Sequence, residues 1–338
     1  MKLKFLLLFF LLSQNIDFAW GAAADFEWDE APRPANLMSL ANAHGLRIFW
    51  WNIHNGRIGK KPTPSLSRNL IQLIHSNLAP DIMVFGEYQN SSLSAGAHAE
   101  LQDAYPYSFQ WSYPPTPGYG QVAFSKYPMS VSRMEPLDFT PIQPITEAQR
   151  DHYREVWCAP REACTRMFVS LDINVGGKVI QLIPIHLFDG WRKYSQLDGQ
   201  METALEILFG KDNPVAFQLS RFQALLRESL KPALDAASDP AMKVRPTIVI
   251  GDFNIPKTLM NVKTRMYQNL AHNLVEVFKR NPTTFPAMSA QERGHYPNME
   301  IDHAFLAGKL QSRGAEVLPL RGSDHYPISL VVSMDQMQ

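Results

Sequence analysis

The sequence predicts an α+β protein, a four-layer α/β/β/α sandwich in which two packed mixed β-sheets are flanked by helices. Short apolar runs rich in β-branched and aromatic residues recur along the chain, which is typical of strands. Segments with apolar residues three and four positions apart lie between some of these runs, as expected for amphipathic helices. Several strand-like runs also follow one another directly, and this favours hairpins within two packed sheets.

Nine apolar runs are the candidate strands. They cover residues 46–53, 81–88, 107–113, 121–127, 166–175, 178–188, 247–255, 301–308 and 326–334. Two adjacent glycines, Gly176 and Gly177, separate the fifth run from the sixth, and this spacing predicts a hairpin with its turn at the glycines.

Three segments are the candidate helices. Residues 66–78 carry leucine and isoleucine on one stripe, and Pro80 follows them. Residues 216–230 show the same spacing of phenylalanine and leucine ahead of Pro232. A third helix is expected from Thr258 to about His272.

The chain is expected to begin with a signal peptide at residues 1–24, cleaved at about 21–24. Lys2 and Lys4 precede eight apolar residues, Phe5 to Leu12, and small residues follow. The alternative is a membrane-anchoring helix, but the apolar stretch is shorter than a bilayer requires. We therefore expect a secreted or periplasmic protein without a stable membrane anchor.

The remainder, residues 25–338, is interpreted as one catalytic domain and as a monomer. No Gly- or Ser-rich linker divides it, and no repeat of 20–50 residues is visible. Residues 187–214 show the least pattern and are interpreted as an insertion.

Charge and cysteine content restrict the class of protein. Lys and Arg total 32, as do Asp and Glu, so the chain lacks the strong basicity typical of nucleic-acid binders, although a local basic groove is compatible with this balance. The two cysteines, Cys158 and Cys164, are close enough to close a small disulfide loop in an oxidising compartment. Zinc binding is the poorer alternative, because two thiols without a nearby histidine make an incomplete site.

Polar residues stand where the predicted strands end. Six segments carry them: Asn52, Glu87, His186, Asp252 with Asn254, Asp302, and Asp324 with His325. Each position alone has an ordinary alternative, such as a strand cap, a surface charge or a buried histidine with satisfied hydrogen bonds. Strand ends of one sheet layer can open into the same cleft, so the joint pattern predicts a single site.

The residue types favour phosphate-ester hydrolysis. Mg²⁺ prefers carboxylate and amide oxygens, so Glu87, Asn52 and an aspartate suit magnesium better than zinc. Two histidines away from the metal can act as acid and base or as hydrogen-bond donors. Such cleavage needs a deprotonated water, a neutralised charge and a stabilised leaving oxygen. The expected cofactor is Mg²⁺, with Mn²⁺ or Ca²⁺ as alternatives.

The same segments resemble the signature blocks of the endonuclease/exonuclease/phosphatase superfamily, which includes pancreatic-type deoxyribonucleases, bacterial sphingomyelinases and inositol polyphosphate 5-phosphatases. The blocks are WNIHNG (51–56), DIMVFGE (81–87), IPIHL (183–187), GDFN (251–254), IDH (301–303) and SDHYP (323–327). YGQVAFSKYP, residues 119–128, is similar to a further family stretch. The matches extend from residue 47 to residue 330, and GDFN followed by SDHYP at this distance is highly specific.

The resemblance implies a role for each matched residue. Glu87 would be the main metal ligand, with Asn52 beside it and Asp324 as a further contributor. Asp252 and Asn254 would position the water and the scissile phosphate.

The remaining roles concern acid–base chemistry and phosphate binding. His325 would be the general base, oriented by Asp302, and His186 would donate to a phosphate oxygen or assist the leaving group. Arg166 would support phosphate binding, whereas His303 has no assigned role.

Two departures from the family pattern stand out. His54 occupies the position where the apurinic-endonuclease branch has an acidic metal ligand, which argues against a second metal and against apurinic-site repair. The GEYQ stretch around Glu87 also differs from the commoner Gln-Glu pair, although the glutamate is kept.

The substrate class is the least determined feature. A nuclease is the leading interpretation. Five basic residues are candidates to line a nucleic-acid groove, with solvated surface as the alternative: Lys60, Lys61, Arg192, Lys193 and Arg221. A phospholipid or sphingomyelin phosphodiesterase would use an exposed apolar stretch such as residues 111–119 or 204–210. An inositol-phosphate phosphatase would need converging basic residues, and the sequence shows no such cluster.

A secreted non-catalytic binding module on the same scaffold is the alternative from another class. An inactive relative would be expected to lose one of the matched polar residues. All of them are retained here, which favours an enzyme: Glu87, His186, Asp252, Asn254 and His325.

Overall fold

The computed structural model describes two long stretches and several short segments of the chain. The described residues are 43–58, 61–62, 64–114, 116–137, 166–187, 221–226, 228–229, 245–255, 257–259, 262–263, 267, 274–278, 284, 300–318, 320 and 322–335. The predicted signal peptide, the cysteines Cys158 and Cys164 and all but the first residue of the predicted insertion at 187–214 lie outside these residues, and so do Lys60, Arg192 and Lys193.

The first sheet has six strands in the order β15-β16-β1-β4-β6-β5. Its strands are β1 (Leu46–Asn52), β4 (Ile82–Tyr88), β5 (Tyr107–Tyr113), β6 (Thr116–Ser125), β15 (Gln311–Val317) and β16 (Ile328–Ser333). Strands β1 and β4 are parallel and the other neighbours are antiparallel, so the sheet is mixed, as predicted.

The second sheet also has six strands, in the order β13-β14-β10-β9-β8-β7. They are β7 (Met129–Leu137), β8 (Arg166–Val175), β9 (Lys178–His186), β10 (Thr247–Asp252), β13 (Val275–Glu276) and β14 (Asp302–Ala307). Its single parallel pair is β9 and β10. Each of the nine candidate runs therefore overlaps a strand of one of the two sheets, whereas β7, β13 and β15 were not among the candidates.

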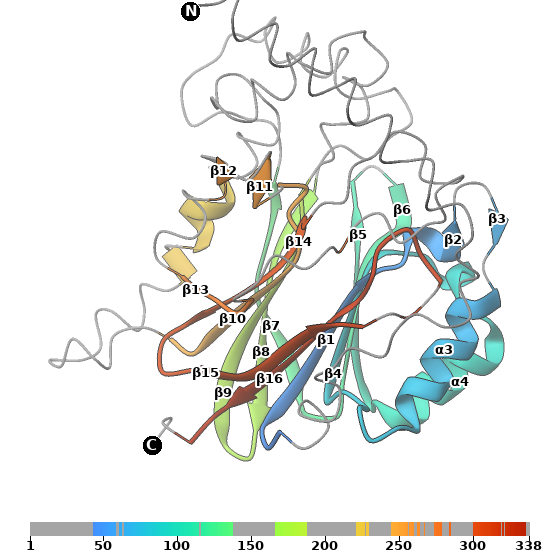
Figure 1. Ribbon diagram of the computed structural model, residues 1–338, viewed down its shortest axis with the longest axis horizontal. Helices are drawn as coiled ribbons and strands as arrows, with labels where there is room; N and C mark the ends of the chain where they lie inside the picture. Colours follow the sequence, from blue (N-terminus) through green and yellow to red (C-terminus); the bar gives the residue numbers. More distant parts are fainter. Residues whose placement is uncertain are drawn as a thin grey trace, which may run out of the picture.

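The two sheets pack face to face, and Figure 1 shows them as two curved layers. The core between them takes every second residue of each strand, because successive side chains of a strand point to opposite faces. Ile48 and Trp50 of β1 lie in this core, and Ile248 and Ile250 of β10 meet them from the second sheet. The residues in between, such as Phe49, belong to the outer face.

Helices α3 (Pro64–Ile74) and α4 (Ala95–Ala104) cover the outer face of the first sheet, where Figure 1 shows them side by side. Helix α3 ends four residues before the predicted end at 78, because Ser76 N bonds to Leu73 O in a tighter turn. Helix α4 was not predicted from the sequence, because it has Gly96 near its start and buries few apolar residues on its inner face.

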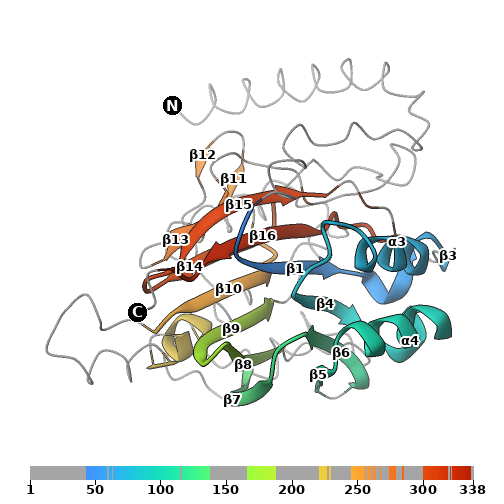
Figure 2. The ribbon, with the colours of Figure 1, turned by 90° about the horizontal axis from the view of Figure 1, so that it is seen from below.

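The outer face of the second sheet is covered by the described part of the predicted helix at 216–230. Residues 221–226 and 228–229 are helical, and Phe222, Leu225 and Leu226 pack with Phe168 and Val249 of the sheet. Figure 2 shows the layers edge-on from below. Two sheets between helical layers confirm the predicted sandwich.

The prediction of a helix from Thr258 to about His272 is wrong for its first residues, which form strands. Strands β11 (Thr258–Leu259) and β12 (Val262–Lys263) form an antiparallel pair in which Leu259 lies opposite Val262. The β-branched Thr258 and Val262 favour this extended pairing over a helix. From 264 to 272 the structure describes Tyr267 alone, which is helical.

The predicted hairpin between the fifth and sixth runs is confirmed. Gly176 and Gly177 adopt φ values of 60° and 86° between the paired residues Val175 and Lys178. Two successive residues with positive φ are the signature of the turn that best matches the twist of a hairpin.

A second two-stranded ribbon and two short 3₁₀ helices complete the labelled elements. Strand β2 (Arg57–Ile58) pairs with β3 (Lys61–Pro62), and the 3₁₀ helices are η1 (His54–Gly56) and η2 (Asn90–Ser92). None of the described helices is long and apolar enough to cross a membrane.

The parallel pair β9 and β10 brings two polar residues into register. Asp252 at the end of β10 pairs with His186 at the end of β9. The preceding residue, Gly251, lies so close to β9 that a Cβ atom at this position would be 1.9 Å from the carbonyl oxygen of Ile185. A side chain at position 251 therefore cannot be accommodated without separating the two strands.

We predict that Gly251→Ala lowers the free energy of unfolding by about 2–4 kcal/mol, because backbone atoms rather than a flexible side chain block the added methyl group. The control is Gly96→Ala in α4, where an added Cβ meets nothing within 4 Å and a gain of up to about 1 kcal/mol is expected. Urea unfolding followed by circular dichroism measures both. Equal stability of the two variants would contradict the prediction.

Candidate active site

The predicted site residues meet where the ends of the two sheets face each other. Strands β1, β4, β9 and β10 end at this edge, β14 begins there, and the segment before β16 returns to it. Hydrogen bonds and ion pairs connect six side chains, directly or through one another: Asn52, Glu87, His186, Asp252, Asp302 and His325. Asp324 joins this group through His54, and Asn254 joins it through its backbone nitrogen, which donates to Asp252.

Strand alternation directs most of these side chains inward. Asp252 follows Ile250 on the core face of β10, and Asp302 precedes Ala304 on the core face of β14. The intervening His303 packs on the outer face among aromatic rings, where its Nε2 lies 2.7 Å from the carbonyl oxygen of Ile255. This position outside the site agrees with the absence of an assigned role for His303.

Glu87 reaches the site through an irregularity in β4. Phe85 pairs with Val122, but the next pair is Tyr88 with Gly120, so two residues of β4 face one residue of β6. Glu87 within this bulge has a φ of 51°. Both Phe85 and Tyr88 lie on the outer, helix-covered face, and the bulge turns Glu87 to the opposite side, toward Asn52.

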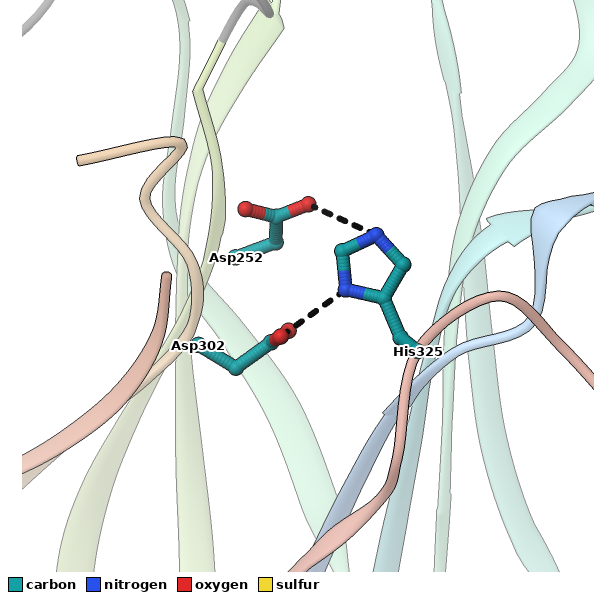
Figure 3. A group of neighbouring side chains, drawn as sticks. All are labelled: Asp252, Asp302 and His325. Carbon is teal, nitrogen blue, oxygen red and sulfur yellow. Dashed lines mark hydrogen bonds and ion pairs between the residues drawn. The ribbon is translucent and has the colours of Figure 1, made fainter. Parts of the chain in front are cut away.

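His325 and Asp302 form a buried pair, drawn in Figure 3. The Nδ1 atom of His325 lies 2.8 Å from Asp302 Oδ2, and the indole Nε1 of Trp50 donates to Asp302 Oδ1 at 2.9 Å. Asp252, Asp302 and His325 together bring their ligand atoms within 4.8 Å of one another. Because both oxygens of Asp302 already accept hydrogen bonds, this trio is better suited to moving a proton than to holding a metal ion.

Asp252 lies at the centre of the polar group. Its Oδ2 accepts a hydrogen bond from Asn52 Nδ2 at 3.0 Å, and its Oδ1 accepts one from the backbone nitrogen of Asn254 at 2.8 Å. The Nε2 atoms of His186 and His325 each lie 3.7 Å from Asp252 Oδ2. One carboxylate oxygen therefore faces two imidazole rings, one at the end of β9 in the second sheet and one in the segment before β16 of the first sheet.

The electrostatics favour protonation of the pair formed by His325 and Asp252. Burial disfavours the imidazolium, but the charges of Asp302 and Asp252 outweigh it and raise the pKa of His325 to about 10. Burial, together with the charge of Asp302, raises the pKa of Asp252 well above its usual range. The two groups lie close enough to titrate as a pair rather than separately.

A second group of oxygens is suited to a divalent cation. Carboxylate oxygens of Glu87 and Asp324 lie 3.8 Å and 3.2 Å from Nδ1 of His54. Burial opposes ionisation of Asp324, but hydrogen bonding and the charge of His54 outweigh it and lower the pKa of the carboxyl group. Two carboxylates that lie beside the same imidazole offer the hard oxygen donors that Mg²⁺, Mn²⁺ or Ca²⁺ prefers.

Asn52 presents its amide nitrogen to this group. Its Nδ2 lies 3.3 Å from Glu87 Oε1, while its Oδ1 accepts from the backbone nitrogen of His54 at 3.2 Å. In the arrangement described, Asn52 thus orients Glu87 and Asp252, and its predicted role as a metal ligand stays a prediction.

Two further basic residues of the prediction, Arg166 and Arg221, make different contacts. Arg166 places its guanidinium carbon 4.6 Å from the centre of the Tyr113 ring, and Tyr113 in turn contacts His186. Arg221 instead forms an ion pair with Glu135 at 3.0 Å on the side of β7, which supports the surface alternative over the groove for this residue.

Three residues of the site were missed by the sequence analysis. Trp50 orients Asp302, Tyr113 contacts Nδ1 of His186 at 2.9 Å, and Ser323 Oγ donates to the carbonyl oxygen of Asn52 at 2.6 Å. A signal existed for Trp50, which precedes Asn52 by two residues and shares its face, and for Ser323, which adjoins Asp324. For Tyr113 the sequence carries no signal, because β5 contributes no other residue to the predicted pattern.

We predict that Trp50→Phe lowers the free energy of unfolding by about 1–3 kcal/mol more than Trp111→Phe does. Trp50→Phe leaves a buried carboxylate oxygen of Asp302 without its donor. Trp111 is a matched control in the same core, because its buried indole nitrogen has no hydrogen-bond partner to lose. Urea unfolding of both variants measures the difference, and equal losses would show that the Trp50 hydrogen bond contributes nothing.

Comparison with known proteins identifies the family of this chain. Residues 49–325 match the Endonuclease/Exonuclease/phosphatase family. The sequence has no significant match among curated proteins.

Solved structures with the same fold include two bacterial members of the family. The chain is similar to the endonuclease/exonuclease/phosphatase of Beutenbergia cavernae DSM 12333, with 18% identity, a TM-score of 0.52, and coverage of 86% of this chain and 72% of that one. The corresponding protein of Bacteroides vulgatus gives 14% identity and a TM-score of 0.53, and the match covers 87% of this chain and 100% of that one.

A third similar structure is D. rerio TDP2 complexed with a single-stranded DNA product. It is 14% identical with a TM-score of 0.52, and the match covers 86% of this chain and 100% of that one. Identities this low establish the fold alone, but the family match spans most of the sequence and includes both sheets and the site. The chain therefore belongs to the endonuclease/exonuclease/phosphatase family, whose members are phosphoesterase hydrolases.

Proposed function

We propose that this protein is an exported, divalent-metal-dependent hydrolase that cleaves a phosphodiester by attack of water, with nucleic acid as its substrate. The observation that carries the proposal is the position of Asp252, whose Oδ2 faces the Nε2 atoms of His186 and His325 at 3.7 Å each. Two imidazoles around one carboxylate, beside a separate pair of carboxylates, supply acid–base groups and a cation site within one polar cluster.

Glu87 and Asp324 would hold the cation, with Asn52 orienting Glu87. We propose Mg²⁺, with Mn²⁺ or Ca²⁺ as alternatives, because the donors are oxygens. When bound, such a cation polarises a phosphate oxygen and neutralises the charge that develops on it. His54 contacts both carboxylates where a further acidic ligand would otherwise stand, which supports one cation rather than two.

His325 would be the general base, as the sequence predicts. Asp302 accepts from Nδ1 and so leaves Nε2 facing Asp252 and the site. The pair of His325 and Asp252 must lose a proton before it can accept one from water. The pair is therefore competent as a base only above its own pKa.

The remaining residues would bind and orient the phosphate. His186 would donate from Nε2 to a phosphate oxygen or to the leaving oxygen. Asn254 has a φ of 50°; its backbone nitrogen donates to Asp252, and its side-chain nitrogen donates to the carbonyl oxygen of Leu187 at 2.8 Å, so Asn254 connects Asp252 to the residue that follows β9. Arg166, whose guanidinium carbon lies 4.6 Å from the centre of the Tyr113 ring, would support phosphate binding.

We propose nucleic acid as the substrate, rather than lipid or inositol phosphate, because of one similar structure. The TDP2 structure, which shares this fold, holds a single-stranded DNA product. Export is proposed from the lysine-flanked apolar stretch at residues 1–24. A phospholipid or sphingomyelin phosphodiesterase is the alternative that the same site chemistry accommodates.

We predict that His186→Ala and His325→Ala each reduce metal-dependent hydrolysis by about 100-fold or more, because each removes a group placed to transfer or donate a proton. The assay compares single-stranded DNA, plasmid DNA, RNA, sphingomyelin and an inositol phosphate, each with Mg²⁺ and with chelator. His75→Ala is the control, since His75 is an exposed histidine paired with Glu100 at 2.9 Å on the helical side. Wild-type turnover by either site variant would overturn the assignment, and turnover of sphingomyelin alone would replace nucleic acid by lipid.

We also predict that Asp302→Asn moves the rising limb of the pH profile of kcat/KM to lower pH. The negative charge of Asp302 stabilises the imidazolium and raises the pKa of His325, so its removal lowers that pKa and frees the base at lower pH. The maximal rate should fall as well, because an uncharged amide at this position would no longer fix the ring through an ionic hydrogen bond. Both profiles are measured at the same Mg²⁺ concentration, and a limb that stays in place or moves to higher pH would count against His325 as the base.

A further inference from the structure

Tyr113 makes a buried contact with His186 that the chemistry above leaves unexplained. The hydroxyl oxygen of Tyr113 lies 2.9 Å from Nδ1 of His186, and the two rings are 5.6 Å apart at 68°. Tyr113 ends β5 in the first sheet and His186 ends β9 in the second, so the contact crosses between the sheets. Both side chains are buried.

The other ring nitrogen of His186 faces negative charge. Nε2 lies 3.7 Å from Glu87 Oε1 and 3.7 Å from Asp252 Oδ2. A lone pair on Nε2 would point at two carboxylate oxygens, whereas an N–H there is attracted to both. The surroundings therefore favour the tautomer that carries its proton on Nε2, in which Nδ1 can only accept a hydrogen bond.

Tyr113 is placed to supply that hydrogen bond. A phenol can either donate or accept, so the ring nitrogen it faces sets its role. We propose that Tyr113 is a positioning residue that donates its hydroxyl hydrogen to Nδ1 of His186 and so fixes the tautomer whose N–H is on Nε2, directed toward Glu87 and Asp252.

The surroundings of Tyr113 keep the phenol protonated and its ring in place. Burial raises the pKa of Tyr113 well above its usual range, and the nearby Arg166 charge only partly opposes this. The Arg166 guanidinium carbon lies 4.6 Å from the ring centre, and the Tyr119 ring packs edge-on at 5.4 Å. Contacts on the ring thus fix the position of a protonated hydroxyl beside Nδ1 of His186.

The consequence for catalysis rests on the proposed function. His325 is paired with a carboxylate, Asp302, which favours its charged form. His186 is paired instead with an uncharged phenol, which fixes the tautomer without adding negative charge at Nδ1. The two histidines would therefore do different work, His325 exchanging a proton and His186 donating a hydrogen bond from Nε2 to an oxygen of the substrate.

The tautomer can be measured without any substrate. ¹⁵N-histidine-labelled protein, as the full chain with Mg²⁺, gives a separate signal for a protonated and an unprotonated ring nitrogen, and the His186 signals are assigned by their loss in His186→Gln. We expect wild type at neutral pH to show His186 with N–H on Nε2 and an unprotonated Nδ1. In Tyr113→Phe we expect a mixture of tautomers or a protonated ring, because the phenylalanine keeps the ring but has no hydroxyl.

Tyr105→Phe is the matched control. Tyr105 is a buried tyrosine of the first sheet's helical side whose hydroxyl donates to the carbonyl oxygen of Pro80 at 2.9 Å. The Tyr105→Phe variant loses one buried hydrogen bond of a hydroxyl group, as Tyr113→Phe does, but this bond does not involve His186. We expect the His186 signals of Tyr105→Phe to match those of wild type.

Kinetics add a second readout. Tyr113→Phe should lower kcat by about 10- to 100-fold with little change in KM, and Tyr105→Phe should leave both unchanged. A proton on Nδ1 of His186 in wild type, a protonated ring in wild type, or an unchanged tautomer in Tyr113→Phe would each overturn the inference. If no phosphoester is cleaved by wild type, the proposed function fails, and the nitrogen signals still decide the role of Tyr113.

Discussion

The site depends on hydrogen bonds that cross from one sheet to the other. Asn52 bonds to Asp252, Trp50 and His325 bond to Asp302, and Tyr113 contacts His186, in each case from the first sheet or its connecting segment to the second. The apolar core beneath fixes the distance between the sheets, because interiors pack too tightly to let the layers slide. The polar groups can therefore be held at hydrogen-bonding distance without a rigid loop around them. A displacement of one sheet would break all of these contacts together.

Local backbone strain supplies what regular strands cannot. Glu87 and Asn254 both have positive φ, at 51° and 50°, and each stands where a strand of the site ends or bulges. Regular alternation would turn Glu87 toward the helices, and the strained bulge turns it toward the site instead. Such conformations cost of the order of 1–3 kcal/mol each, and the surrounding sheets are what makes them tolerable. Among the described residues, the other two non-glycine residues with positive φ are His54 and Asn55, which lie in η1 shortly after β1.

The two histidines differ because their partners differ. His325 has the carboxylate of Asp302 at Nδ1, and its pKa is raised to about 10 despite burial. His186 has a phenol whose own pKa is raised by burial, so that partner brings no charge. Asp252 faces both rings, and its high pKa follows from burial beside the negative Asp302. One carboxylate therefore faces an imidazole paired with a carboxylate and an imidazole paired with an uncharged phenol, an asymmetric arrangement that suits acid–base chemistry.

The sequence by itself determined the layered fold and the identity of the polar residues at the strand ends. Strand periodicity placed Asn52, Asp252 and Asp302 on the core faces, and their convergence followed from the shared edge of the two sheets. Periodicity failed for the segment from Thr258, where the short strands β11 and β12 pair with each other. It also failed for α4, whose apolar pattern is weak. Only the tertiary structure decided the partners of these groups. Trp50 and Tyr113 reach residues 252 and 73 positions away in the chain, and no local pattern encodes a contact whose geometry is set by how two sheets dock.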